Sequence, residues 1–442
     1  MQSSEPLSVG VVGLGYVGLP LLASFASTGY TVVGLDRDSD KIAQLEATGE
    51  PGFYEPGVQE AIARHRSDIT FTTDYGAMMR ACRAIFITVG TEMREDGTPN
   101  LDGVNGCRES IASHLAVGHL IVLKSTVQTG TTRAFARELE KSTGLKAEGD
   151  FFVAYWPERT IEGHALHELG LLPKIVGGLG EQSAEMTGSI VSRLGGRVIK
   201  VSAPEVAEMC KLVDNSYRAV NIAFANEVGR ACEALSINAA ELVAAINDGY
   251  DRTALFNSGL GAGGPCLSKD PTVLVGAASE LGVEMPITHA SITSNIQATL
   301  QVGEWVREYV QDRALHLPRI ALIGLAFKGT PETDDTRGSP ASILRRYLRD
   351  AFPDAVFVYH DPIVTDFEGQ SVAPTITEAL DGANVALFLT NHPRITQISS
   401  SLIQQAHPEP EMLLVDCWNN LADPQVLVAN GTKVYRVGDG TV

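Results

Sequence analysis

The sequence is poor in basic residues: its 442 residues include 34 Lys and Arg against 53 Asp and Glu, a formal net charge of −19. A strongly acidic chain is repelled by phosphate backbones and by anionic lipid. This balance argues against a nucleic-acid-binding protein and against one that binds an acidic membrane surface. An anionic ligand would have to be held by a few local basic groups.

The sequence also lacks paired cysteines. Its six cysteines show no C-x-x-C pair and no regular spacing. This pattern excludes a zinc module, and we expect no metal cofactor. It predicts reduced thiols, as in a cytoplasmic protein.

A long uninterrupted hydrophobic run is missing as well. The apolar segment of residues 7–35 contains Pro20 and six glycines, and no basic leader precedes it. We interpret it as strand, turn, helix and strand rather than as a membrane span or a signal peptide. A cytoplasmic location is therefore expected.

That segment carries a nucleotide-binding pattern. Residues 7–13 form a short β-branched apolar run, which predicts a buried parallel strand. The run leads into Gly13-Leu14-Gly15-Tyr16-Val17-Gly18, a helical pattern that ends near Gly29, and a second strand at residues 31–35 followed by Asp36. Strand, G-x-G-x-x-G, helix, strand and acid together are typical of a dinucleotide site.

The residue types fit that chemistry. We expect Gly13 to make the turn, Gly15 to admit the pyrophosphate and Gly18 to let the helix pack on the strand. Asp36 would accept a hydrogen bond from the adenosine ribose and repel a 2′-phosphate. NAD is therefore favoured over NADP, although Arg37 stands next to the acid.

Polar loops follow three further predicted strands, at residues 84–88, 120–123 and 151–155. Loops at the carboxyl ends of parallel strands line the ligand crevice, so Thr91 and Thr126 are expected to contact the cofactor, unless they only cap the next helix. Glu158 and Arg159 could handle water and an anionic substrate. A local ion pair between them is the alternative.

A long helix is predicted from Pro204 to about residue 235. Apolar residues recur three or four apart from Val206 to Val228, and this stripe suggests a homodimer or higher homo-oligomer built around the helix. A second stripe is polar and contains Glu208, Lys211, Asn215 and Arg218. Its default interpretation is a solvated face, and the alternative is that Lys211 and Asn215 look into a crevice.

Residues 261–271, Gly-Ala-Gly-Gly-Pro-Cys-Leu-Ser-Lys-Asp-Pro, place Cys266 after a glycine-rich turn. Asp270 and Pro271 predict a helix start, which puts Cys266 in the loop just before that helix. The helix N-terminus would favour the reactive thiolate. The alternative is a buried structural cysteine.

A weak internal repeat follows. Residues 320–327 echo residues 9–16 position by position, and a strand at residues 356–360 ends at Asp361 as the earlier one ends at Asp36. Ala326 replaces the second glycine and Lys328 follows closely. This region should bind something other than a full dinucleotide, such as a nucleoside diphosphate held by Lys328.

These patterns predict an α/β protein with two Rossmann-like, doubly wound parallel-sheet domains joined by a central helical domain with one long helix. The chain is too long for one ordinary domain. The predicted boundaries are residues 1–202, 203–316 and 317–442.

Taken together, the motifs resemble the UDP-glucose/GDP-mannose dehydrogenase family nearly end to end. The matching stretches are residues 13–20, 123–130, 157–159, 208–227, 261–271, 324–328 and 333–341. Family members oxidise C6 of a nucleotide-sugar to a carboxylate, using NAD⁺ twice and a cysteine thioester. The resemblance assigns NAD to the first domain, the catalytic cysteine loop and dimerisation to the second, and the UDP-sugar to the third.

By the same resemblance, Cys266 is the nucleophile, Lys211 and Asn215 stabilise the oxyanion, and Asp270, Glu158 and Thr126 position or deprotonate water and the C6 hydroxyl. The expected cofactor-binding residues are Gly13, Gly15, Tyr16, Val17, Gly18, Asp36, Arg37, Thr91, Thr126 and Arg337. The expected substrate-binding residues are Glu158, Arg159, Lys211, Asn215, Arg218, Arg252, Gly263, Phe327 and Lys328.

Residues 218–227 resemble the branch that acts on UDP-N-acetylhexosamines, especially UDP-N-acetylmannosamine, for surface polysaccharide precursors. Pro265 stands where that branch usually has histidine, and the segment after Lys328 carries about two extra residues. UDP-glucose 6-dehydrogenase stays an alternative. So do a two-electron NAD dehydrogenase that needs no thiol, and a Rossmann-fold scaffold without catalysis.

Overall fold

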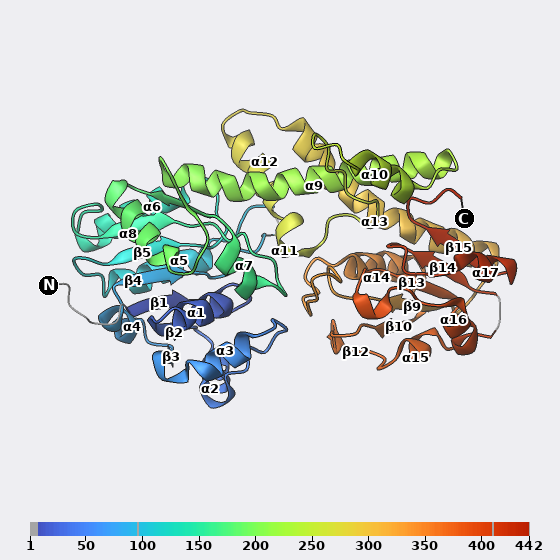
Figure 1. Cartoon of the computed structure of the whole chain (residues 1–442), viewed down its shortest axis with the longest axis horizontal. Coiled ribbons are helices and arrows are strands. Elements are labelled where there is room, and N and C mark those ends of the chain that lie inside the picture. Colours follow the sequence, from blue (N-terminus) through green and yellow to red (C-terminus); the bar gives the residue numbers. More distant parts are fainter. Residues whose placement is uncertain (1–7, 95–96, 409–410, 442) are drawn as a thin grey trace. The chain divides into compact units, whose positions relative to one another are not determined.

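The computed structural model describes residues 8–94, 97–408 and 411–441. The chain divides into two compact units (Figure 1): the first contains Met1–Asp214 and Gly276–Gly282, and the second contains Asn215–Val275 and Val283–Val442. The predicted first strand starts at Leu7, which lies outside the described residues, and the bounds of the three predicted domains stay predictions. None of the helices in the described ranges combines the length and the hydropathy that a membrane span requires.

The first unit is built on an eight-stranded sheet with the order β3-β2-β1-β4-β5-β6-β7-β8. Neighbouring strands are parallel except β6 and β7, which are antiparallel. The chain crosses from β1 to β2 on one side and later to β4 on the other, which makes the end of β1 the switch point where ligands bind. The strands are β1 (Ser8–Val12), β2 (Thr31–Leu35), β3 (Ile69–Thr72), β4 (Ala84–Ile87), β5 (Leu120–Leu123), β6 (Phe152–Tyr155), β7 (Lys174–Gly178) and β8 (Val198–Val201).

Helices cover both faces of this sheet because its strands are apolar on both sides. In β5, Leu120 and Val122 join one hydrophobic core, whereas Ile121 and Leu123 join the other. The first core is shared with α1 (Gly18–Ser27), α2 (Ser39–Thr48), α3 (Val58–Arg64), α7 (Ala165–Leu171) and α8 (Glu181–Ser192), and the second with α4 (Tyr75–Ala81), α5 (Asp102–Ala112) and α6 (Thr131–Thr143).

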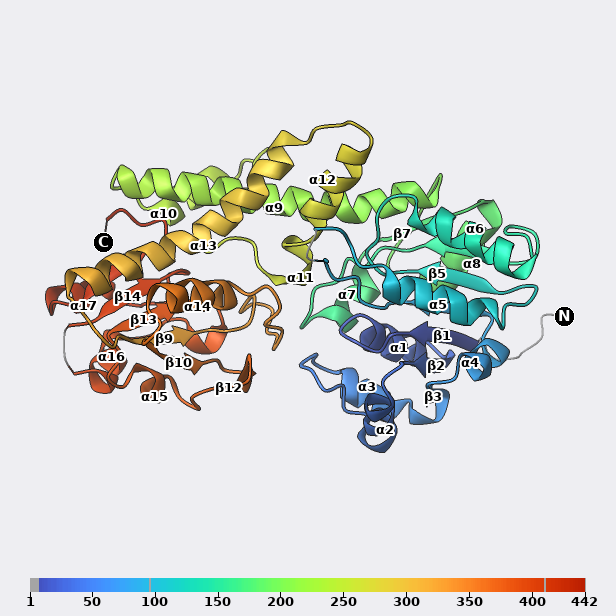
Figure 2. The ribbon, with the colours of Figure 1, turned by 180° about the vertical axis from the view of Figure 1, so that it is seen from behind.

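The second unit holds a five-stranded parallel sheet with the order β10-β9-β13-β14-β15. Figure 2 shows α13 beside α14, which contacts it. These two helices cover one face, and α15, α16 and α17 cover the other. The strands are β9 (Arg319–Ile323), β10 (Val356–His360), β13 (Val385–Phe388), β14 (Leu413–Asp416) and β15 (Lys433–Arg436), with a small hairpin of β11 (Asp366–Phe367) and β12 (Gln370–Ser371).

Within the described ranges the remaining α-helices are α9 (Pro204–Ala234), α10 (Ala239–Asn247), α11 (Gly264–Leu267), α12 (Asp270–Glu280), α13 (Pro286–Asp312), α14 (Pro340–Ala351), α15 (Ile376–Leu380), α16 (Ser400–Ala406) and α17 (Pro424–Ala429). The predicted fold class, two Rossmann-like sheets joined by a helical region with one long helix, is confirmed. The predicted internal repeat is also visible, since β10-β9-β13 repeats the order β2-β1-β4.

The acids that follow β2 and β10, Asp36 and Asp361, make the same kind of hydrogen bond. Asp36 accepts a hydrogen bond from the backbone N–H of Leu14 at 2.8 Å, and Asp361 accepts one from that of Leu325 at 2.7 Å. Each acid therefore fixes the turn that follows the first strand of its own sheet. The repeat extends from the sequence to the hydrogen bonds of the turn.

Helix α9 has 31 residues, which confirms the predicted long helix. The default interpretation of its polar stripe as a solvated face is wrong, because Glu208, Lys211 and Asn215 are buried and only Arg218 of the four is exposed. Five members of the apolar stripe are instead between 41% and 66% exposed: Val206, Met209, Val213, Tyr217 and Phe224. Two of the buried side chains have hydrogen-bond partners on other elements, Glu208 on α6 and Asn215 on α12.

Glu208 is the clearest case. Its Oε1 accepts hydrogen bonds from the backbone N–H and the hydroxyl of Thr132 at 2.8 and 2.6 Å, and its Oε2 accepts one from the N–H of Gly130 at 2.6 Å. These N–H groups belong to the first turn of α6, whose own N-cap residue, Gly130, has no side chain. Glu208 therefore caps α6 from another helix, with its charge at the positive helix end.

We expect Glu208→Gln to destabilise the first unit by about 1–3 kcal/mol, because the amide group cannot replace both acceptor oxygens. The measurement is the urea midpoint, together with amide hydrogen exchange in residues 130–134. Glu205→Gln is the matched control, since Glu205 lies one turn earlier and pairs with Arg133 near the surface, where a lost pair costs below about 1 kcal/mol. Equal effects of the two variants would contradict the capping role.

Candidate active site

The turn between β1 and α1 has the geometry of a dinucleotide-binding turn. Gly13 has a φ of +91°, a conformation that residues other than glycine rarely adopt. A Cβ on Gly18 would lie 1.8 Å from the Gly13 carbonyl oxygen, so the helix packs closely only because the side chain is missing. A Cβ on Gly15 would meet no described atom within 4 Å. The space above Gly15 therefore fits the pyrophosphate of a dinucleotide.

Asp36 lies at the end of β2 and is 9% exposed. Beyond Leu14 it binds the backbone N–H of Asp38 at 3.1 Å and the Lys41 ammonium group at 3.1 Å. Burial alone would raise the pKa of the Asp36 carboxyl, but these hydrogen bonds hold that pKa below its usual value. Asp36 therefore carries a full negative charge near neutral pH. Arg37 beside it is exposed.

Thr91 and Thr126 lie in the loops after β4 and β5, and the Thr91 hydroxyl donates a hydrogen bond to the Thr126 carbonyl at 2.6 Å. Neither residue caps the helix that follows, since the N-cap residues of α5 and α6 are Leu101 and Gly130. The structure thus brings the two predicted threonines together at the crevice edge of the sheet. The ring of Tyr16 packs against Phe53, with centroids 4.2 Å apart.

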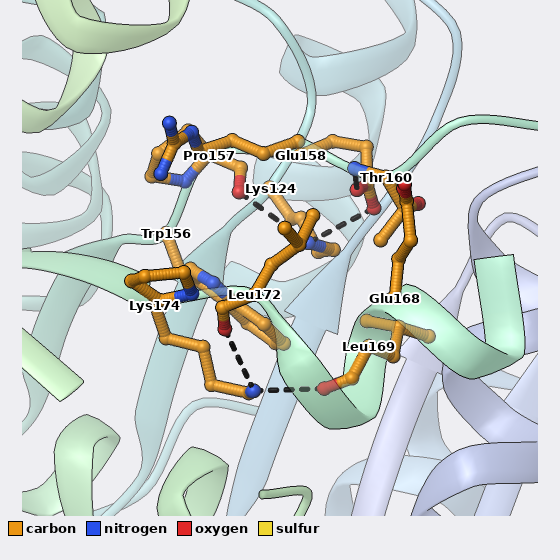
Figure 3. A pocket seen from close by; sticks show the side chains of 11 residues that line it. Lys124, Trp156, Pro157, Glu158, Thr160, Glu168, Leu169, Leu172 and Lys174 are labelled. Atoms are coloured by element: carbon orange, nitrogen blue, oxygen red, sulfur yellow. Dashed lines mark hydrogen bonds and ion pairs between the residues drawn. The ribbon is translucent and has the colours of Figure 1, made fainter. Parts of the chain in front are cut away.

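Glu158 follows β6 and binds a lysine from the neighbouring strand exit (Figure 3). The Lys124 ammonium nitrogen lies 3.0 Å from Glu158 Oε2, and the backbone N–H of Thr160 donates to Glu158 Oε1 at 2.6 Å. The predicted alternative, an ion pair between Glu158 and Arg159, is wrong. Arg159 binds Asp214 instead, at 2.8 Å.

Burial and charge act in opposite directions on this carboxylate. Burial raises the pKa of Glu158. Attraction from Lys124 and hydrogen bonds from Thr160 and Lys124 lower this pKa by more than burial raises it, so the pKa lies below its usual value. Burial lowers the pKa of Lys124, Glu158 opposes this effect, and the nearby charge of Lys211 adds to it. Lys211, Lys124 and Glu158 therefore interact electrostatically within the first unit.

The cysteine segment belongs to the second unit. Cys266 is exposed and lies in α11, a single turn of helix, rather than in a loop as predicted. The alternative of a buried structural cysteine is also wrong. Asp270 is the first residue of α12, as expected, and is fully buried. Among the described residues no disulfide bond joins any of the six cysteines.

Asp270 has one satisfied and one unsatisfied oxygen. The amide nitrogen of Asn215 donates to Asp270 Oδ2 at 2.6 Å. Asp270 Oδ1 lies 3.9 Å from the Lys269 ammonium nitrogen, beyond hydrogen-bond distance, and accepts no hydrogen bond from any described residue. A buried carboxylate oxygen without a donor is costly, so this atom suits a water or a substrate hydroxyl. Asn215 fixes the orientation of the carboxylate.

The glycine-rich segment before Cys266 is clamped on two sides. Asn295 of α13 accepts a hydrogen bond from the N–H of Ala262 at 3.2 Å and donates to the Ala219 carbonyl at 3.0 Å. On the other side, Gly264 has a φ of +85°, its N–H donates to the Gly338 carbonyl at 3.1 Å, and a Cβ there would lie 2.5 Å from the Phe327 ring. Two predicted substrate segments, at Gly263 and Phe327, therefore meet.

Four further predicted residues are cations of the second unit. Arg337 binds Asp335 with two guanidinium nitrogens, and the Lys328 ammonium group donates to the Pro331 carbonyl. Arg252 is exposed, with its guanidinium 4.9 Å from the centroid of the Tyr250 ring. Arg218 is exposed on α9.

Sequence reasoning missed two residues, Lys124 and Asn295. Lys124 could have been noticed, because it directly follows four buried residues of β5, where a charged side chain needs a partner. Nothing local marks Asn295, which lies in the middle of α13. In addition, no group of three or more His, Cys, Asp or Glu side chains in the described ranges could hold a metal ion.

The chain is similar to known proteins along most of its length. The UDP-glucose/GDP-mannose dehydrogenase family matches in three parts: its NAD binding domain over residues 7–194, its central domain over residues 205–297 and its UDP binding domain over residues 321–423.

Individual relatives of the chain are named as nucleotide-sugar dehydrogenases. A UDP-N-acetyl-D-mannosamine dehydrogenase of Pyrococcus horikoshii is 30% identical over 434 residues, which cover 95% of this chain and 97% of the relative. A UDP-glucose 6-dehydrogenase of Haloferax volcanii is 32% identical over 403 residues, or 87% of this chain and 91% of the relative. A solved structure of UDP-D-ManNAc dehydrogenase from Pyrococcus horikoshii superposes with a TM-score of 0.88 at 29% identity, covering 99% of this chain and 100% of the other.

The two glycines of the turn give a paired prediction. Gly15→Ala should fold normally but weaken NAD⁺ binding by about tenfold or more, because the new methyl group occupies the space for the pyrophosphate. Gly18→Ala should lower the melting temperature, because its Cβ would collide with the Gly13 carbonyl. The measurements are calorimetric NAD⁺ titration and thermal unfolding. Undiminished NAD⁺ affinity in Gly15→Ala would rule out this cofactor position.

Proposed function

Since the chain belongs to the UDP-glucose/GDP-mannose dehydrogenase family, and is therefore an NAD-dependent nucleotide-sugar dehydrogenase, we propose that it oxidises C6 of a UDP-N-acetylhexosamine to the carboxylate. UDP-N-acetylmannosamine is the first candidate. The observation that carries the chemical part of the proposal is the exposed Cys266, four residues before a buried, half-satisfied carboxylate at Asp270.

The reaction removes four electrons in two steps. NAD⁺, when bound, accepts the hydride in each. In the first step the C6 alcohol loses a hydride and a proton to give an aldehyde. The Cys266 thiolate adds to that carbonyl carbon, and the resulting C–S bond keeps C6 in place. Loss of a second hydride gives a thioester, and attack by water breaks the C–S bond, which releases the carboxylate and the thiol.

The residues of this chain would share the proton and charge work. Asp270 Oδ1 can accept the proton of a hydroxyl or a water, and Asn215 keeps that carboxylate oriented. Lys211, one turn before Asn215 on α9, and the Asn215 amide are donors suited to an oxyanion. Glu158 and Thr126 would position water or the C6 hydroxyl. Arg159, Arg218, Arg252 and Lys328 would bind the anionic substrate, and Arg337 would lie near the cofactor.

The sugar is proposed from similarity. Residues 218–227 resemble the N-acetylhexosamine branch, and the Pyrococcus horikoshii relative carries that name. The Haloferax volcanii relative has the higher identity and is a UDP-glucose 6-dehydrogenase, which keeps UDP-glucose as the second candidate. In either case the uronate product suits a surface polysaccharide or glycan precursor. Six cysteines without a disulfide in the described residues fit a reducing compartment.

We also propose that the protein is a homodimer. The exposed stripe of α9, formed by Val206, Met209, Val213, Tyr217 and Phe224, is too apolar to remain in water on a long helix. A second copy of the same helix would cover it with a matching stripe, as two-fold symmetry requires.

For the central prediction, Cys266→Ala should abolish the acyl intermediate, and Cys266→Ser should stall after the sugar is attached or hydrolyse extremely slowly. Nucleotide binding should survive in both. Asp270→Asn should slow turnover by about a hundredfold or more, since an acid–base group is lost. The measurement is mass spectrometry of enzyme quenched during turnover, where wild type should show a sugar adduct on Cys266.

Counting NADH per sugar is the control for this prediction. Wild type should form two NADH for each molecule of UDP-N-acetylmannosamine or, failing that, of UDP-glucose. One NADH per sugar, or two from Cys266→Ala, would overturn the thioester mechanism. The preferred sugar in the same panel decides between the two substrates.

For the dimer, Tyr217→Glu combined with Phe224→Glu should yield monomers at micromolar concentration, because two charges would be buried against a matching apolar face. Light scattering during gel filtration measures this. Leu317→Glu is the control, since Leu317 is also exposed but lies outside α9. A monomeric wild type, or a dimer that survives the double substitution, would exclude this interface.

A further inference from the structure

Lys124 is a buried cation that takes no part in the mechanism proposed above. Its side chain is 1% exposed. Its ammonium nitrogen meets three electron-rich groups (Figure 3): Glu158 Oε2 at 3.0 Å, the Pro157 carbonyl at 3.5 Å and the Trp156 ring, whose centroid is 3.7 Å away. All three favour the charged form of the amine.

Such a pair is hard to explain by stability. Removing an amine and a carboxylate from water costs several kcal/mol per ion, and an apolar pair of similar volume often packs as well or better. The nearby Lys174 shows the contrast. It is also buried, but it binds the carbonyls of Leu169, Leu172 and Gly195, and so joins the end of α7 to the end of the α8 segment. Lys124 joins the exits of β5 and β6, and, unlike Lys174, its charged partner is the carboxylate expected to touch substrate.

The contacts of Glu158 leave its carboxylate no freedom to turn. Lys124 holds Oε2 while the Thr160 N–H holds Oε1, so both oxygens are fixed from opposite chain segments. Each oxygen still has a second lone pair, which can accept a hydrogen bond from water or from a hydroxyl. The charged groups around the pair are Lys211 of α9, Glu168 of α7, Lys174 of β7 and the Arg159–Asp214 ion pair.

We propose that Lys124 is a positioning residue for the sugar oxidation: it fixes the Glu158 carboxylate and keeps it ionised, so that Glu158 acts as a hydrogen-bond acceptor. This inference rests on the proposed function and deepens it. Lys124 touches neither substrate nor cofactor and acts only through Glu158. The low pKa of Glu158 agrees with this role, because Lys124 is the largest source of the lowering.

The test compares Lys124→Met, which keeps the length but not the charge, with Lys124→Arg, which keeps the charge. Lys124→Met should lower kcat by about a hundredfold at pH 7 with little change in the KM for the sugar. The acidic limb of its pH–rate profile should move upward by about one to three pH units, the usual effect of losing an opposite charge at this distance. Lys124→Arg should restore most of the wild-type profile.

A double-mutant cycle separates positioning from simple stabilisation. In a Glu158→Gln background, Lys124→Met should cost little further activity, because the residue through which it acts is gone. This double variant also buries no unpaired carboxylate, so it should fold even if Lys124→Met does not. Lys174→Met is the matched control: it should lower the melting temperature without moving the acidic limb.

Three results would overturn the inference: an unmoved acidic limb in a folded Lys124→Met, full additivity with Glu158→Gln, or the same limb shift in Lys174→Met. If wild type oxidises no UDP-sugar, the proposed function fails. Carbon-13 NMR can still show whether Lys124 keeps the Glu158 carboxylate ionised. The Glu158 carboxyl signal, identified by its loss in Glu158→Gln, should titrate at a higher pH in Lys124→Met, or in a Lys124→Gln variant should the former not fold. An unchanged titration would exclude the role.

Discussion

The burial of polar side chains along one face of α9 is the constraint on which the rest of the structure depends. A buried polar group must find a partner, because an unsatisfied one costs about 1–3 kcal/mol. On α9 several of these groups lie on one face and engage different elements. Glu208 caps α6, and Asn215 orients Asp270 of α12. Further along, the Asn226 side chain accepts a hydrogen bond from the N–H of Gly259 at 2.9 Å.

One helix therefore supplies fixed partners to the elements of both units in turn. Since successive polar residues lie on the same stripe, the register of α9 sets them all together. A shift of one residue would remove every one of these bonds at once. The same geometry turns the apolar stripe outward, so the exposed hydrophobic surface of α9 is a consequence of the buried polar one.

The two sheets share one hydrogen bond at their first turn, but the two turns have different neighbours. In both, an acid at the end of the second strand fixes the turn after the first strand, through Leu14 in one and Leu325 in the other. In the first unit the space over Gly15 stays open for a dinucleotide. In the second, Ala326 takes the equivalent position, and the neighbouring Phe327 packs on Gly264 of the cysteine segment. The second turn thus supports the start of α11, the single helical turn that carries Cys266.

The sequence by itself determined the order of the elements and the chemistry of the turns. Strand, glycine turn, helix and acid are encoded by local conformational needs, such as the positive φ of Gly13, and so could be predicted with the fold class. The length of α9 was predictable from the apolar residues that recur three or four apart along it. Cys266 and Asp270 were found from their spacing, although the single turn of α11 around Cys266 was not.

Only the tertiary structure decided which face of α9 is covered and which charged groups meet. Periodicity gives the angle of each side chain around a helix, but not what packs on either side, so it left both a solvated and a crevice-facing position open for Lys211 and Asn215. Partners such as Lys124 with Glu158, and Asn295 with Ala262, are distant in sequence and are joined only by the sheet order and the packing of α13. Local sequence carries no signal for such pairs, because their energy depends on the burial that folding creates.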